Sequence, residues 1–214
     1  MAAVEITQIK QTKKGRYALF CAQGFLFSVD EDTFVRFGIR KGSVFDDRQM
    51  NELLSASDLR RAESKALDLL GMREHAQREL VRKLEKSFDA DTAARAAARM
   101  QELGLIDDRR FAERYAQELL RKGKSLREAE QKLLEKGVSR EIAKQALEQF
   151  ERDETGTLRA LIDKKYRLRL QKPDGYRAVT AALMRRGFSL RDIRAALEAF
   201  GQDADEQDCG EEFF

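Results

Sequence analysis

The chain has 214 residues, of which 37% are charged and 42% hydrophobic, with 13 phenylalanines, no tryptophan and one proline. This length allows one or two ordinary domains or a short array of small modules, and the apolar content can build a core, which argues against a disordered chain. No apolar run approaches the roughly 20 residues that cross a bilayer, and the N-terminus lacks a signal-peptide core, so we expect no membrane span and no secretion.

The net charge of +3 conceals an asymmetry. Residues 201–214 carry six acidic and no basic residues, so residues 1–200 have a net charge of +9. Residues 151–200 hold 12 basic and 7 acidic residues, so much of this charge lies in the last part of the body. A basic surface attracts nucleic acid or an acidic protein groove, and the alternative is an ordinary solvated helix face.

Residues 1–56 favour a small β-rich extension, a hairpin or meander with short helices. Apolar and aromatic runs at 17–21 and 25–29 are separated by glycine turns, and weaker alternation covers residues 4–9. Such runs between turns are typical of antiparallel strands. Asp30 is positioned to cap a short helix over residues 33–37, and residues 43–45 favour a last strand.

A segment that recurs every 50 residues dominates the rest of the chain. Its three copies read Leu84-Glu85-Lys86-Ser87-Phe88, Leu134-Glu135-Lys136-Gly137-Val138 and Met184-Arg185-Arg186-Gly187-Phe188. A fixed period indicates one supersecondary unit used repeatedly, with neighbouring units stacked on each other. We therefore expect a mainly α fold: a tandem array of three three-helix, helix-turn-helix-like repeats at 57–104, 105–150 and 151–200, elongated and curved.

Capping residues and breaks set the helix boundaries within these repeats. Gly104 ends the first repeat, either Asp107 or Asp108 can cap the next helix, and Ser125 and Glu128 form a capping box. The third repeat follows the same plan, with a break at 172–175 and a capping serine at 189. Beyond it, we expect residues 201–214 to form a disordered acidic tail.

The sequence contains no arrangement of residues that supports catalysis. His75 is the only histidine and lies at a helix junction, where a capping or surface role is expected. Cys21 and Cys209 have no metal-ligand spacing and read as free thiols in a reducing cytoplasm, and no phosphate-binding glycine motif occurs. We expect no enzyme activity, no catalytic or metal-binding residues and no cofactor.

Clustered basic residues in the third repeat remain as candidates for contact with a partner. The set consists of Lys164, Lys165, Arg167, Arg169, Arg185 and Arg186. Lys164 and Arg167 share one helix face, since residues three apart are neighbours on a helix. Lys136 and Arg73 are second choices, because either could simply favour a helix C-terminus.

The order of several short motifs resembles the RecX family over roughly residues 57–200. These motifs are Ala66 to His75 (ALDLLGMREH), Glu79 to Leu84 (ELVRKL), Gly104 to Tyr115 (GLIDDRRFAERY), Leu134 to Val138 (LEKGV), Lys164 to Tyr166 (KKY) and Arg185 to Ser189 (RRGFS). One departure is Ala76, where the family usually has a small hydroxyl residue that caps the following helix. The acidic tail also lies outside the shared pattern.

The resemblance implies a cytoplasmic, monomeric regulator of the RecA recombinase in DNA repair, recombination and the SOS response. Such proteins bind the RecA–single-stranded-DNA filament and restrain ATP hydrolysis, strand exchange and co-protease activity. The basic faces could also contact single- or double-stranded DNA. The alternative is a direct, non-specific DNA-binding protein of tandem helical modules that acts without RecA.

Overall fold

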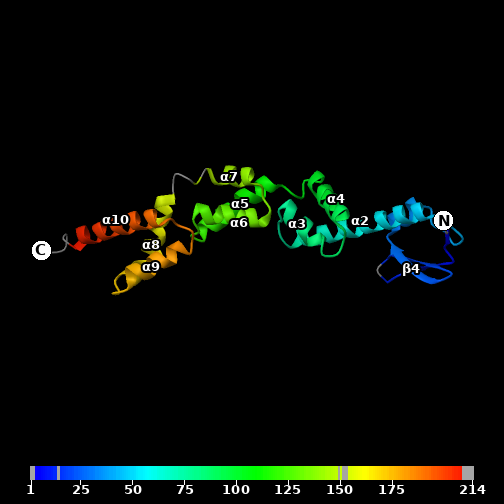
Figure 1. The fold of residues 1–214 in the computed structure, drawn as a ribbon, viewed down its shortest axis with the longest axis horizontal. Helices are drawn as coiled ribbons and strands as arrows, with labels where there is room; N and C mark the ends of the chain where they lie inside the picture. Colours follow the sequence, from blue (N-terminus) through cyan, green and yellow to red (C-terminus); the bar gives the residue numbers. More distant parts are fainter. Residues whose placement is uncertain (1–2, 14, 149, 151–153, 209–214) are drawn as a thin grey trace. The chain divides into compact units, whose positions relative to one another are not determined.

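The structure is a computed structural model that describes residues 3–13, 15–148, 150 and 154–208. The chain divides into two compact units, residues 1–106 and residues 107–214. Three sets of three helices follow a few short strands, which confirms the predicted mainly α fold of three-helix repeats with a β-rich start (Figure 1). No helix in the described part of the chain combines the length and apolarity that a membrane span requires.

The N-terminal β module contains two small antiparallel sheets. Strand β1 (Val4–Glu5) pairs with β5 (Val44–Phe45), and a three-stranded sheet has the order β2 (Gln8–Gln11), β3 (Tyr17–Cys21), β4 (Gly24–Val29). Helix α1 (Glu31–Arg36) follows, and its first turn is capped as expected.

The cap of α1 is Asp30, whose Oδ1 accepts a hydrogen bond from the backbone N–H of Thr33 at 2.9 Å. The core of the β module contains Leu19, Val29 and Leu53, which are fully buried. Leu53 comes from the next helix, so the small sheet is stabilised by packing on a helix, as two or three strands alone would require.

Helix α2 (Asp47–Met72) crosses the boundary that the sequence placed between residues 56 and 57. A capping box starts it: Gln49 N–H donates to Asp46 Oδ1 at 2.7 Å, and the Asp46 N–H donates to Gln49 Oε1 at 3.0 Å. Its first half packs in the β module through Leu53, and its second half packs in the first repeat through Ala62. The 50-residue period shows only where the three repeats become similar to one another, whereas the helix begins earlier, at its N-cap Asp46.

The first repeat is completed by α3 (Gln77–Leu84) and α4 (Ala90–Glu102). Leu80, Leu84 and Met100 are fully or almost fully buried in its core. The N-cap of α3 is Ala76, which makes no side-chain capping hydrogen bond, as its side chain predicts.

The second repeat consists of α5 (Asp108–Arg121), α6 (Leu126–Lys136) and α7 (Arg140–Glu148). Asp107 caps α5 by accepting hydrogen bonds from the N–H groups of Arg109 and Arg110, both at 3.0 Å. Of the two aspartates that the sequence offered as a cap, Asp107 is therefore the N-cap.

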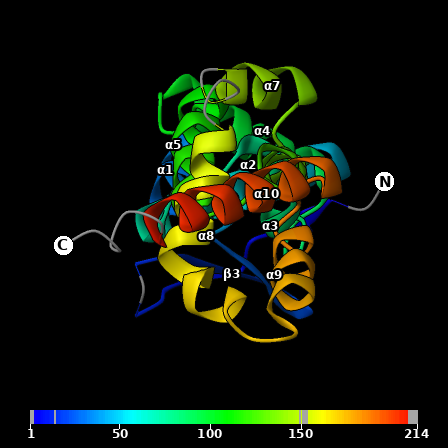
Figure 2. The same cartoon turned by 90° about the vertical axis from the view of Figure 1, so that its left-hand side faces the viewer.

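The third repeat consists of α8 (Glu154–Leu170), α9 (Gly175–Met184) and α10 (Leu190–Asp208). Helices α8 and α10 cross in contact, and α9 packs against both (Figure 2). Ile162, Leu183 and Ile193, one from each helix, are fully buried in a shared core.

Helix α10 differs from the prediction of a disordered tail from residue 201 onward. Its backbone remains helical to Asp208, eight residues further than expected. Residues 202–208 contain no proline or glycine and consist of alanine, glutamine and acidic residues, so nothing in this stretch breaks a helix once α10 has started. The rest of the predicted tail, residues 209–214 with Cys209, lies outside the described residues.

Candidate interaction site at the junction of the second and third repeats

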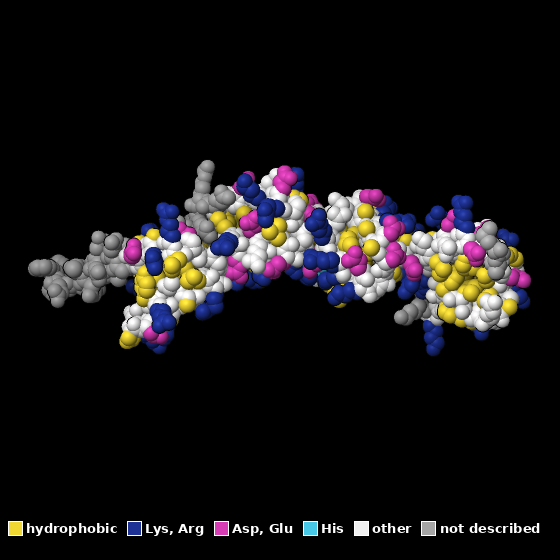
Figure 3. Space-filling view, viewed as in Figure 1, with side chains coloured by type: hydrophobic (Ala, Val, Ile, Leu, Met, Phe, Trp, Pro, Cys, Tyr) yellow, Lys and Arg dark blue, Asp and Glu magenta, His cyan; other side chains and the backbone are white. Residues whose placement is uncertain are grey.

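The structure places four of the six candidate basic residues on α8 and two at the end of α9. Basic and acidic side chains are interspersed over the helices of both units (Figure 3). Arg167 forms an exposed ion pair with Asp163 at 3.5 Å, and Arg169 pairs with Asp174 at 2.5 Å. Lys164 and Lys165 are exposed and form no ion pair with another described residue, which leaves both ammonium groups facing solvent.

Arg186 has a structural role that the sequence did not indicate. Its guanidinium Nη1 donates to the backbone carbonyl oxygens of Lys122 at 2.9 Å and Gly123 at 3.0 Å, where α5 ends. Its own carbonyl oxygen accepts a hydrogen bond from the N–H of Ser125 at 3.0 Å. A cation is favourable at the carbonyl end of a helix, so Arg186 joins the third repeat to the second.

Two turns pack closely where Arg186 makes these contacts. Gly187 has φ +87°, and a Cβ atom there would lie 2.4 Å from Ser125 Oγ and 2.9 Å from Glu128 Cβ. The Ser125 hydroxyl caps α6 by accepting from the Glu128 N–H at 3.2 Å. The predicted capping box is therefore only half formed, because the Ser125 N–H is already bonded to Arg186.

A groove of about 600 Å³ lies beside this contact, between the end of α5, the α5–α6 turn and the start of α8. Its apolar lining includes Leu120, Leu126, Phe150 and Leu161. The charged residues in the described part of its lining are all basic: Arg121, Lys122, Lys124, Lys164 and Lys165. We call this surface the basic groove.

The basic groove brings two predicted residues together with three that the sequence reasoning missed. Lys164 and Lys165 come from α8, whereas Arg121, Lys122 and Lys124 come from the end of α5 and the turn after it. Lys122 and Lys124 are ion-paired with Glu118 and Glu128, one turn away in each case. The signal available in the sequence was a helix C-terminus that is rich in basic residues.

The chemistry of the basic groove suits binding. Five cations and an apolar floor can attract a polyanion that also carries apolar groups. No acidic side chain is among the described residues that line it. Its described lining residues include no histidine, cysteine or carboxylate that could transfer a proton or act as a nucleophile.

His75 is buried, so of the two roles expected for it, capping or surface, the surface position is wrong. It is only 2% exposed. Its Nδ1 lies 2.9 Å from the carbonyl oxygen of Arg73, and its Nε2 lies 2.8 Å from Lys83 Nζ. These partners require an Nδ1–H donor and an unprotonated Nε2, which is the neutral ring. No cluster of three or more potential metal ligands occurs among the described residues.

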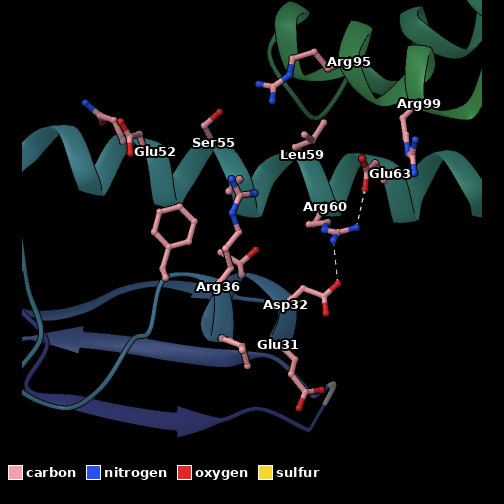
Figure 4. Close-up of a pocket in the computed structure, with 15 residues that line it drawn as sticks. Glu31, Asp32, Arg36, Glu52, Ser55, Leu59, Arg60, Glu63, Arg95 and Arg99 are labelled. Atoms are coloured by element: carbon pink, nitrogen blue, oxygen red, sulfur yellow. Dashed lines mark hydrogen bonds and ion pairs between the residues drawn. The ribbon is translucent and has the colours of Figure 1, made fainter. Parts of the chain in front are cut away.

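A second hollow, of about 1170 Å³, lies in the first unit between α1, α2 and α4 (Figure 4). Arg60 joins α2 to α1 through Asp32 at 3.1 Å and also pairs with Glu63 on its own helix at 3.3 Å. Its lining mixes both signs of charge, including Glu31, Glu52, Arg95 and Arg99. Because these charges offset one another, this hollow is less suited to a polyanion than the basic groove.

The comparison with known families agrees with the resemblance drawn from the sequence. Residues 107–147, which contain α5, α6 and most of α7, match the family model of the second three-helix domain of RecX. Regulatory protein RecX of Levilactobacillus brevis is 30% identical over 120 residues, covering 55% of this chain and 45% of that protein. Regulatory protein RecX of Bacillus licheniformis is 34% identical over 113 residues, covering 51% and 43%. The chain spans about half the length of the curated relatives it matches.

Solved structures support the same fold. A crystal structure of regulatory protein RecX has a TM-score of 0.66 and 24% identity, covering 91% of this chain and 99% of that one. The crystal structure of RecX from Lactobacillus salivarius has a TM-score of 0.59 and 20% identity, covering 69% and 99%. At these identities the likeness establishes the arrangement of helices.

Proposed function

We propose, from the premise that this chain belongs to the RecX family, that it binds the RecA–single-stranded-DNA filament and restrains RecA. The affected activities are ATP hydrolysis, strand exchange and co-protease activity, with consequences for DNA repair, recombination and the SOS response. The protein acts without a cofactor or catalysis of its own, as a monomer in the cytoplasm.

The basic groove is the observation that carries this proposal. Its five cations suit a partner that presents phosphates and acidic side chains together, as a protein filament on DNA does. Its apolar floor adds contact area from which water is expelled on binding. Binding of phosphate alone does not need such apolar contacts, so the floor favours a partner that also contains protein. Lys164, Lys165 and Arg185 remain exposed for such a contact, and Arg167 and Arg169 lie on the same helix as the two lysines.

Arg186 supports the proposal in a different way from the other five residues. Its bonds to Lys122 and Gly123 hold α5 and α9 in register, so the two walls of the groove come from repeats that are locked together. A partner that contacts both repeats therefore binds a surface that is already formed. Binding then has no entropic cost for bringing the two repeats together.

The test of this function is the effect on RecA itself. Adding the full chain to RecA assembled on circular single-stranded DNA should slow steady-state ATP hydrolysis, and inhibition should grow as the chain approaches the RecA concentration. Unchanged ATP turnover at equimolar chain would contradict the proposal. The chain could also slow ATP turnover only by binding DNA that RecA has not yet covered. In that case it would have no effect when it is added to preformed filaments.

Direct, non-specific DNA binding without RecA is the second candidate, and the uniformly basic charge of the groove favours it as well. Mobility-shift measurements without RecA, across a range of salt concentrations, separate the two. Tight binding with a steep salt dependence would make DNA the primary partner, because each neutralised phosphate releases counterions. Weak binding, together with strong inhibition of RecA, supports the leading proposal.

A further inference from the structure

The three-stranded sheet of the N-terminal β module has two faces with different chemistry. Side chains alternate between the faces of a strand, and Ile9, Leu19 and Val29 point toward the core. The paired residues on the opposite side form a surface that we call the outer face of the sheet. They are Gln8, Lys10, Ala18, Phe20, Phe25 and Ser28.

Two aromatic rings and a cation lie together on this outer face. The rings of Phe20 and Phe25 meet edge to face, with centroids 5.6 Å apart and an interplanar angle of 69°. Phe25 is 61% exposed, although burial of a phenylalanine ring is favourable because it removes a large apolar surface from water. Lys10 Nζ lies 5.4 Å from the centroid of Phe20, and hydrophobic side chains gather over this module (Figure 3).

The charge of the outer face favours an anionic partner. Lys10 is exposed on it, and Lys13 is exposed in the turn that joins β2 to β3. None of the six paired positions is acidic. A surface that binds lipid or a second copy of the chain would bind more strongly with aliphatic side chains around the exposed ring. A lysine beside the ring instead suits a ligand that has both planar rings and negative charges.

We propose that the outer face of this sheet binds single-stranded nucleic acid, with a base stacked on Phe25 and a phosphate neutralised by Lys10. Stacking on an exposed aromatic ring tolerates any base, because every base has a flat π-face, and the neighbouring cation follows the backbone. The duplex form is excluded from this contact, because its bases are stacked on each other. The inference goes beyond the regulation of RecA and depends on residues far in sequence from the basic groove.

The experiment compares two single substitutions in the full chain by fluorescence anisotropy with a labelled 20-nucleotide thymidine strand. Phe25→Ala should weaken binding by about tenfold, which corresponds to one stacked base. Val35→Ala is the matched control, because Val35 is 70% exposed on α1 and its loss also removes apolar surface. The control should bind as the wild type does.

A strand of the same length without bases isolates the stacking contact. On this abasic strand, Phe25→Ala should bind as tightly as the wild type, whereas Lys10→Gln should weaken binding to both strands and reduce the salt slope by about one. Circular dichroism should give the same helix and strand content for all variants, so that a loss of binding is not a loss of fold.

Three results would overturn the inference. The first is equal affinity of the Phe25 and Val35 variants for the thymidine strand, and the second is an equal loss for Phe25→Ala on the abasic strand. The third is sedimentation that shows a wild-type dimer which Phe25→Ala dissociates, because the face would then serve self-association. RecA inhibition can persist in each case, so these failures are distinguishable from failure of the regulatory function.

Discussion

Residues with the same charge have different roles in this chain, and only some of those roles can be predicted from the sequence. The sequence predicts Lys164 and Lys165 as a cluster because they are adjacent on one helix, and they line the basic groove. Arg186 was found by the same criterion, yet its guanidinium is bonded to carbonyl oxygens 63 and 64 residues earlier in the chain. Charge is readable in sequence, whereas a partner so distant depends on how the repeats pack.

His75 illustrates a second limit of the same kind. Its position at a helix junction gave no sign of burial, yet the side chain is only 2% exposed. Burial lowers the pKa of His75; the charges of Arg73 and Lys83 also lower it, while the hydrogen bond to the Arg73 carbonyl and the charge of Glu79 oppose the shift. The ring is therefore neutral at neutral pH in the folded chain.

We predict that the pKa of His75, measured by NMR, lies below the ordinary histidine value of about 6.5. Because it is the only histidine, its ring resonance gives an unambiguous titration. With the folded pKa lowered, the unfolded state binds more protons in this range, so the stabilisation is complete above about pH 6.5 and is lost as the pH falls toward the folded pKa. A measured pKa at or above 6.5 would contradict the buried, neutral ring.

At the scale of elements, the 50-residue period reflects helix N-caps at equivalent positions of the three repeats. Ser139 Oγ accepts from the Ile142 N–H at 3.3 Å, and Ser189 Oγ accepts from the Asp192 N–H at 3.1 Å. The first repeat has the same cap 50 residues earlier, where Asp89 accepts from the Thr92 N–H at 3.0 Å. Residue identity relates Ser139 to Ser189 but not to Asp89, because the position keeps its function as a hydrogen-bond acceptor while its residue type changes.

Helix boundaries show where such a pattern stops being informative. The period and the capping residues predicted three helices in each repeat, because those signals are local. The start of α2 at Asp47 and the end of α10 at Asp208 lie outside the repeated pattern. Nothing within the period could therefore mark the end of α10, whereas the start of α2 agrees with the helical pattern that the sequence shows from about Asp46 onward.

We predict that Gly187→Ala loosens the contact between the second and third repeats. The new Cβ would lie 2.4 Å from Ser125 Oγ, in addition to the cost of φ +87°. Gly42→Ala is the matched control, because Gly42 has the same φ of +87° and nothing within 4 Å of its Cβ position. Both should lose about 1 kcal/mol to backbone strain, and overpacking should cost Gly187→Ala a further 1–3 kcal/mol, roughly.

Hydrogen exchange of the full chain measures this difference. In Gly187→Ala, amides at the start of α6 and the end of α9 should exchange faster, since these helices meet at the substituted turn. In Gly42→Ala, both segments should exchange as in the wild type. Equal protection of α6 in the two variants would mean that the two turns do not hold the repeats together.

At the scale of the whole molecule, one three-helix scaffold carries different surfaces on different copies. The third copy has Arg185 and Arg186 where the earlier copies have glutamate and lysine at 85–86 and 135–136. In the structure, this change supplies the arginine that docks the third repeat on the second, beside the basic groove. The sequence predicted the scaffold and the basic character of the last copy, but not the groove, because more than half of its described lining comes from the preceding repeat.

The central claim is that this groove is the surface through which the chain restrains RecA, and a charge reversal tests it most directly. Lys164→Glu combined with Lys165→Glu should weaken inhibition of RecA ATP hydrolysis by roughly tenfold or more, because two cations on the rim become anions. Arg140→Glu combined with Lys144→Glu makes the same change in charge on the exposed face of α7, outside the groove, and should leave inhibition close to that of the wild type. Inhibition that falls equally in both double variants, or in neither, would contradict the account.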